Sequence, residues 1–123
     1  MDEVTLMSGI TLTVYRCGAK GLYVSFSARI ESVTLSPPCC TSCVLDTAND
    51  LEERVYPTYG FDSFQALFLA MRTAVRLLIG HLEYFHDEEF YLDPSAFEQG
   101  QGQTGIDMAT WLAESYAWSI RSE

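Results

Sequence analysis

The spacing of hydrophobic residues gives the first part of the chain the two-residue period of β-strands. Residues 10–15 alternate between apolar and polar side chains, and residues 22–31 alternate more clearly. In the second run, one predicted face carries Leu22, Val24, Phe26, Ala28 and Ile30. This pattern predicts two strands, each with one buried face. Two glycines lie between them in Cys17-Gly18-Ala19-Lys20-Gly21, so we expect a hairpin.

Two further strands are expected before the period changes. The prolines at positions 37 and 38 interrupt regular structure, because proline fixes φ and lacks a backbone donor. Strands are predicted at about residues 42–47 and 51–56, with the turn residues Ala48-Asn49-Asp50 between them. These segments complete a predicted antiparallel meander of four strands.

A long helix is predicted next, at about residues 63–83. Its predicted buried stripe, at three- and four-residue spacing, consists of Phe64, Leu67, Phe68, Met71, Ala74, Val75, Leu78 and Leu82. Asp62 is expected to cap the first turn, and Gln65 is expected to bond in return to the amide of Asp62. Gly60 is expected to have a backbone conformation unsuited to a side chain. The helix is long enough to lie across the whole sheet.

The remainder is expected to form a short fifth strand or a cover for the sheet edge, then a loop and a final helix. Residues 98–105 are rich in glutamine and glycine, which predicts a flexible loop. Asp107 is expected to cap a helix over about residues 107–121. One side of that helix would carry Met108, Trp111, Leu112, Ser115 and Trp118.

The predicted fold class is α+β, an antiparallel four- to five-stranded meander with one long helix packed across it and a short C-terminal helix. We expect one domain over residues 1–123, with its core at about residues 4–93.

The charge of the chain indicates what kind of partner it favours. Seventeen acidic residues face seven lysines and arginines, which gives a formal net charge of -10. A field of this sign repels phosphate backbones and anionic lipids and attracts basic partners. We therefore expect a protein partner, no nucleic acid and no membrane. The apolar stretch at 64–79 contains Arg72 and Arg76, and the first residues do not resemble a secretory signal, so a cytoplasmic location is expected.

Candidate groups for catalysis or metal binding are few. His81 and His86 are five residues apart and do not form the i, i+4 pair of a helical metal site. The cysteines at 17, 39, 40 and 43 lack paired Cys-x-x-Cys knuckles, so reduced thiols are expected rather than a metal site. The glycines at 100, 102 and 105 follow no predicted strand and do not resemble a phosphate loop. We expect no cofactor and no enzymatic activity, although a site that folding assembles from His81, His86 or Cys43 is an alternative.

An acidic and aromatic segment follows the long helix. Carboxylates steer a basic partner, and aromatic rings supply contact area at low entropic cost. The competing interpretation is a surface loop or edge strand whose aromatic residues face inward, and the tryptophans of the last helix could equally form its buried stripe. The predicted partner-binding residues are Glu83, Tyr84, Asp87, Glu88, Glu89, Tyr91, Asp93, Trp111 and Trp118.

The junction Gly60-Phe61-Asp62-Ser63-Phe64-Gln65-Ala66-Leu67 resembles a family of small bacterial domains. In that family a strand leads into Gly-x-Asp-Ser-x-Gln-Ala-Leu and then into a leucine-rich helix. Cys43-Val44-Leu45 is similar to the family's preceding strand. The resemblance covers about residues 10–92 and is specific only at about 60–70. It implies the predicted fold and no established activity, and the Cys39-Cys40 pair, the glutamine-glycine segment and the last helix depart from the family's pattern.

The leading functional hypothesis is an immunity protein that blocks a bacterial toxin or effector through its acidic surface. The support is analogy, since small acidic bacterial domains of this type are similar in character to immunity proteins. A phage-encoded inhibitor of a host defence complex has the same physical requirements. A small-molecule-binding regulatory module, with a pocket between sheet and helix near Cys17 or Arg72, is a further alternative. The sequence does not fix the oligomeric state.

Overall fold

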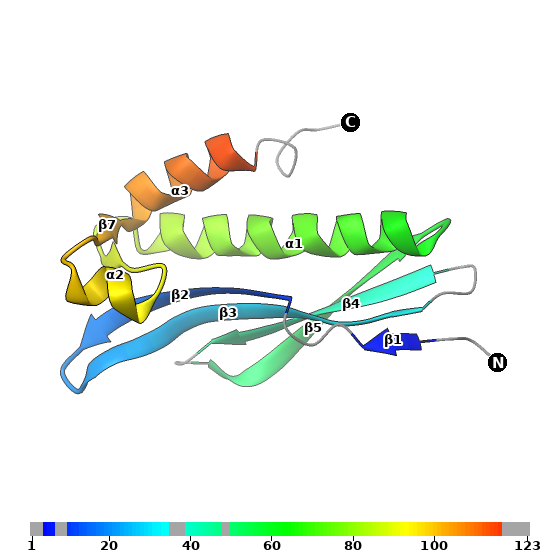
Figure 1. The fold of residues 1–123 in the computed structure, drawn as a ribbon, viewed down its shortest axis with the longest axis horizontal. Coiled ribbons are helices and arrows are strands. Elements are labelled where there is room, and N and C mark those ends of the chain that lie inside the picture. The colour runs from blue at the N-terminus through cyan, green and yellow to red at the C-terminus, as the bar shows by residue number, and fades with distance from the viewer. Residues whose placement is uncertain (1–3, 7–9, 35–38, 48–49, 117–123) are drawn as a thin grey trace.

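An antiparallel sheet lies beneath a layer of helices in the computed structural model, which describes residues 4–6, 10–34, 39–47 and 50–116 (Figure 1). The strands of the main sheet are β1 (Val4–Leu6), β2 (Thr11–Gly18), β3 (Gly21–Thr34), β4 (Cys39–Thr47) and β5 (Asp50–Gly60). The helices are α1 (Ser63–Tyr84), α2 (Pro94–Glu98) and α3 (Gly105–Ser115). A small second sheet consists of β6 (Glu89–Phe90) and β7 (Gln103–Thr104). The predicted α+β fold is confirmed.

Strand β3 organises the main sheet because it pairs along both of its edges. Strand β4 pairs along one edge, whereas β2 and β1 pair with successive parts of the other. Strand β5 pairs with β4 and is the last strand on that side. Strands β2 to β5 therefore form the predicted meander, and β1 adds a fifth strand.

A β-bulge in β3 changes which side chains face the helices. Val14 pairs with Phe26, but the next residue, Tyr15, pairs with Val24, so Ser25 is an extra residue in β3. Cross-strand partners share a face of the sheet, and successive residues alternate between faces. Val24 therefore lies on the face opposite Phe26, and the same holds for Leu22. The prediction that these residues share one face is wrong, because alternation in the sequence does not reveal a bulge.

Helix α1 packs against β3, β4, β5 and α3, and its buried face differs from the predicted stripe in the first half of the helix. Phe64, Phe68 and Met71 are exposed, so the prediction is wrong for these three residues. The first turns approach the sheet closely, since the Thr58 hydroxyl donates to the carbonyl of Ala66 at 3.1 Å. Small side chains fit in the narrow space between the first turns of α1 and the sheet, whereas larger ones do not. The buried residues of the helix are Ala66, Ala70, Ala74, Val75, Leu78 and Leu82.

The start of α1 follows the predicted capping in part. The Asp62 carboxylate accepts a hydrogen bond from the Gln65 amide at 2.8 Å, which confirms the cap. The Gln65 side chain accepts from the amide of Phe61 at 2.7 Å, rather than from that of Asp62 as predicted. Gly60 is not among the described glycines with positive φ. It is needed for a different reason, because a Cβ there would lie 2.6 Å from the backbone nitrogen of Ala66.

The last helix begins earlier than predicted and uses a different cap. The Thr104 hydroxyl accepts from the Asp107 amide at 3.3 Å, so Thr104 is the cap and Asp107 belongs to the first turn. The described part of this helix ends at Ser115. The rest of the predicted helix at 107–121, from residue 117 onward, lies outside the described residues.

Helix α1 is long and apolar enough, by length and composition, to cross a membrane. Core helices of globular proteins meet the same criterion. Here the buried face of α1 contacts the main sheet and α3, and this packing accounts for the apolar residues of that face.

Candidate functional site

The acidic residues that follow α1 gather at one end of the molecule, where α1 ends and where β6 and α2 lie (Figure 1). No lysine or arginine occurs between positions 83 and 98. All the carboxylate side chains in this stretch belong to exposed residues. We call this set the acidic end: Glu83, Asp87, Glu88, Glu89, Asp93 and Glu98.

Backbone hydrogen bonds fix the acidic end to the rest of the fold. Tyr15 and Tyr91 exchange two bonds of 2.8 and 2.9 Å, which join β2 to the residue after β6. The Gly105 amide donates to the carbonyl of Glu88 at 2.8 Å, and the Ile106 amide donates to that of His86 at 3.1 Å. The glutamine-glycine segment, predicted to be a flexible loop, thus contains β7 and brings the start of α3 against the acidic end.

Helix α3 presents an exposed face of mixed acidic and aromatic character. Asp107, Trp111 and Glu114 are exposed, and their spacing of four and three residues places them on one face. The buried residues of this helix are Gly105, Met108, Ala109 and Leu112. Trp111, which is 44 % exposed, therefore lies outside the buried stripe in which the sequence pattern placed it.

Three of the predicted partner-binding residues project freely from the end of α1. Glu83, Tyr84 and Asp87 are all exposed. The Asp87 carboxylate lies 3.1 Å from the Nε2 atom of His86, and both side chains are in solvent. These positions are available to a partner without any change in the fold.

Other predicted partner-binding residues have contacts within the fold. Glu88 lies 3.3 Å from Arg16, and the carboxylate of Asp93 caps α2 by accepting from Ala96 at 2.7 Å. Tyr91 is buried, and its hydroxyl donates to the carboxylate of Glu89. This hydrogen bond, with a smaller contribution from burial, raises the pKa of Tyr91. Tyr91 is therefore a packing residue and does not belong to the exposed surface. Trp118 lies outside the described residues.

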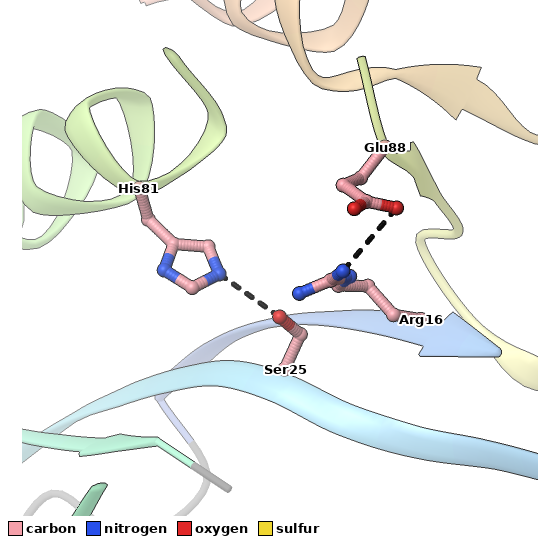
Figure 2. A network of polar contacts seen from close by, with 4 residues as sticks. All are labelled: Arg16, Ser25, His81 and Glu88. Atoms are coloured by element: carbon pink, nitrogen blue, oxygen red, sulfur yellow. Dashed lines mark hydrogen bonds and ion pairs between the residues drawn. The ribbon is translucent and has the colours of Figure 1, made fainter. Parts of the chain in front are cut away.

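A polar cluster beneath the acidic end joins β2, β3 and α1 (Figure 2). The Oγ atom of Ser25 lies 2.9 Å from Nε2 of His81, and the guanidinium of Arg16 pairs with Glu88. The Arg16 guanidinium also lies 4.7 Å from the ring centre of Phe85. The β-bulge at Ser25 is what turns this hydroxyl toward the helix layer. Sequence reasoning missed Ser25 and Arg16 because neither belongs to a motif.

A hydrogen-bonded serine and histidine have the chemistry of a nucleophile and its base. A nucleophile must also meet a substrate, and Ser25 is only 3 % exposed. Glu88, the carboxylate of this cluster, pairs with Arg16 and not with His81. This geometry makes the pair a partly buried structural hydrogen bond between sheet and helix.

The three residues of the enzyme alternative lie in different surroundings. His81 belongs to the buried cluster, whereas His86 is exposed and lies beside Asp87. Cys43 is buried in β4, and burial raises the pKa of its thiol. A thiol with a raised pKa is a weaker nucleophile at neutral pH.

Cys40 and Cys43 of β4 are separated by the pleat of the strand. Cys40 pairs with Tyr59 and Cys43 pairs with Tyr56 in the neighbouring strand, and an odd spacing places Cys40 and Cys43 on opposite faces. Cys17 is exposed on β2. Across the described ranges, no three histidine, cysteine or acidic side chains converge on a point that could hold a metal ion.

The half-buried position of His81 predicts that the stability of the protein depends on pH. Burial lowers the pKa of His81 from its ordinary value near 6.5, and the positive charge of Arg16 lowers it further. Above about pH 6.5, His81 is neutral in both the folded and the unfolded protein. Below pH 6.5, the histidine of the unfolded chain binds a proton, whereas the folded protein resists this protonation. The free energy of unfolding should therefore fall as the pH decreases. Urea unfolding at several pH values between about 5 and 8 measures how the free energy of unfolding changes with pH.

In the variant His81→Gln, the free energy of unfolding should depend less on pH over this range. His86→Gln, which removes the exposed histidine outside this cluster, is the matched control variant. An equal pH dependence of the free energy of unfolding in the wild type and in His81→Gln would contradict the lowered pKa of His81.

An apolar cavity of about 240 Å³ lies away from the acidic end, between α1 and the strands β2 and β3. Its lining is mainly apolar and includes Ala74 from the helix and Ile30 from the sheet, whereas Thr11 and Tyr116 carry hydroxyl groups. Met71, the neighbour of Arg72 in sequence, lines it from α1.

Comparison with family models, curated proteins and solved structures finds no match for this chain. The resemblance at residues 60–70 therefore stays a prediction.

Proposed function

We propose that this protein binds and neutralises another protein through the acidic end and the exposed face of α3. In this proposal it is an immunity protein that acts in the cytoplasm on a bacterial toxin or effector with a basic surface. The proposal rests on one observation above all. The acidic end, whose segment 83–98 contains no lysine or arginine, adjoins a helix face on which an exposed tryptophan stands between two carboxylates.

The physical roles of the two parts are different. Carboxylates concentrated at one end steer a basic partner and accelerate the encounter, and this effect is screened by salt. Trp111 and Tyr84 supply large apolar areas of the kind that dominates binding energy at interfaces. Charge thus favours the encounter, and the aromatic rings favour a long-lived complex.

Neutralisation by binding requires no catalytic group on this chain. It requires a surface that persists in the free protein, because ordering a flexible segment on binding costs affinity. The β6–β7 pairing and the bonds of Tyr15 to Tyr91 support this condition, since they hold the acidic end on the core. A phage-encoded inhibitor of a host defence complex would use the same surface and differ only in its partner.

Co-expression with the product of a neighbouring toxin-like gene tests the proposal. We expect the two proteins to copurify at moderate salt and the toxicity of the partner to be relieved. Loss of copurification with unrelieved toxicity would contradict it.

The alternative of a small-molecule-binding module is supported by the apolar cavity, since ligand pockets are concave and mostly apolar. A thermal-shift titration separates the two functions. Stabilisation by an apolar ligand that Ala74→Leu abolishes would favour the module.

A further inference from the structure

A second surface lies at the opposite end of α1 from the acidic end, where β5 passes into the helix (Figure 1). Three phenylalanines there are exposed to solvent. We call them the aromatic end: Phe61, Phe64 and Phe68, which are 88, 81 and 39 % exposed.

Packing of the fold does not explain this exposure. Ala66 and Ala70 fill the space between the first turns of α1 and the sheet, and both are fully buried. Phe64 and Phe68 are four residues apart and share the outer side of the same turns. Contiguous apolar patches of this kind on a folded protein mark interaction sites.

The exposed area is close to that of a weak protein–protein contact. If a whole aromatic side chain offers roughly 200 Å², the three rings expose roughly 400 Å² on each copy. Standard interfaces bury about 800 Å² on each partner, and transient ones bury less. Met71, which is also exposed and lies three residues after Phe68 in α1, can enlarge the contact.

The distribution of charge indicates which partner fits. Helix α1 has 22 residues and is about 33 Å long, so it separates the aromatic end from the acidic end. Two copies joined through their aromatic ends would hold their acidic ends far beyond the Debye length of about 8 Å. The acidic ends therefore do not oppose the association of two copies at the aromatic end, where Asp62 is the exposed acidic residue between Phe61 and Phe64. An anionic membrane, in contrast, repels a protein with a net charge of -10 as a whole.

We propose that the aromatic end is the contact surface of a two-fold symmetric homodimer. Each copy presents the same rings to the other, which closes the assembly at two chains. The acidic ends then point away from the contact and stay available to a different partner. This inference does not depend on the proposed function.

Sedimentation equilibrium over a dilution series, from micromolar to submillimolar protein, tests the proposal. We expect the mass of the wild type to rise from that of a monomer to that of a dimer. The double variant Phe61→Ser/Phe64→Ser should stay monomeric over the same range. Its circular dichroism and Tm should match those of the wild type, because both rings are exposed.

The matched control is Leu92→Ser/Ile106→Ser, which removes two exposed apolar side chains close to the acidic end. This variant should dimerise like the wild type. A wild type that is monomeric throughout, an equal dimer in both double variants, or growth beyond a dimer would each overturn the proposal.

Discussion

Replacing Phe90 with alanine is expected to lower the free energy of unfolding by about 3–5 kcal/mol. Phe90 lies in β6 and is completely buried. Its ring meets the ring of His81 edge-on at 5.8 Å between centres, and the Arg16 guanidinium lies 5.6 Å from it. The substitution leaves a cavity where the acidic end joins the core. Urea unfolding of the wild type and the variant at neutral pH measures the difference.

The matched control for this prediction is Phe97→Ala in α2. Phe97 is a phenylalanine of the same end of the molecule but is exposed, and its ring meets that of Tyr91 edge-on at 5.1 Å between centres. Its replacement should cost much less than that of Phe90. An equal loss of unfolding free energy in the two variants would contradict the role of Phe90 in holding β6 on the core.

The variant Gly105→Ala is expected to destabilise the protein by about 1–3 kcal/mol, as overpacking does. A Cβ at this position would collide with the carbonyl oxygens of Leu82 and Phe85 at the end of α1. These are backbone atoms of a packed helix end and cannot move as a side chain does. The first turn of α3 must therefore shift away from α1, which also weakens the hydrogen bond from Gly105 to Glu88.

Gly80→Ala provides a control of opposite sign. Gly80 lies inside α1, and a Cβ there meets no atom within 4 Å. Alanine is a better helix former than glycine, so this variant should be more stable by about 0.5–1 kcal/mol. Thermal unfolding of the two variants should give Tm shifts in opposite directions. A raised Tm for Gly105→Ala would contradict the close packing of α3 on α1.

The architecture was predictable because periodicity reports which residues are buried. The alternation in residues 22–31 and the helical spacing after Asp62 identified the meander and α1. What periodicity cannot report is a change of face within an element. The bulge at Ser25 leaves the alternation in the sequence unchanged but places Val24 on the sheet face opposite Phe26. The close approach of α1 to β5 leaves room for Ala66 at the buried side of the helix, whereas Phe64 is exposed.

The candidate site was predictable in part, since charge is visible in the sequence and burial is not. The carboxylates of residues 83–93 are at the surface because their hydration is costly to remove. Tyr91 faces inward and Trp111 faces outward because β6 and β7 fix how the chain enters α3. The contact between Arg16 and Glu88 spans 72 positions and depends on the fold as a whole.

The most direct test of the central proposal is the Kd of the copurified partner for three forms of the protein. These are the wild type, Glu83→Lys/Asp87→Lys at the acidic end, and Glu31→Lys/Asp46→Lys at exposed positions of β3 and β4. Both double variants change the net charge equally. We expect the acidic-end variant to bind at least about tenfold more weakly and the control to bind nearly as the wild type does. Equal weakening by both variants, or no weakening by either, would contradict binding through the acidic end.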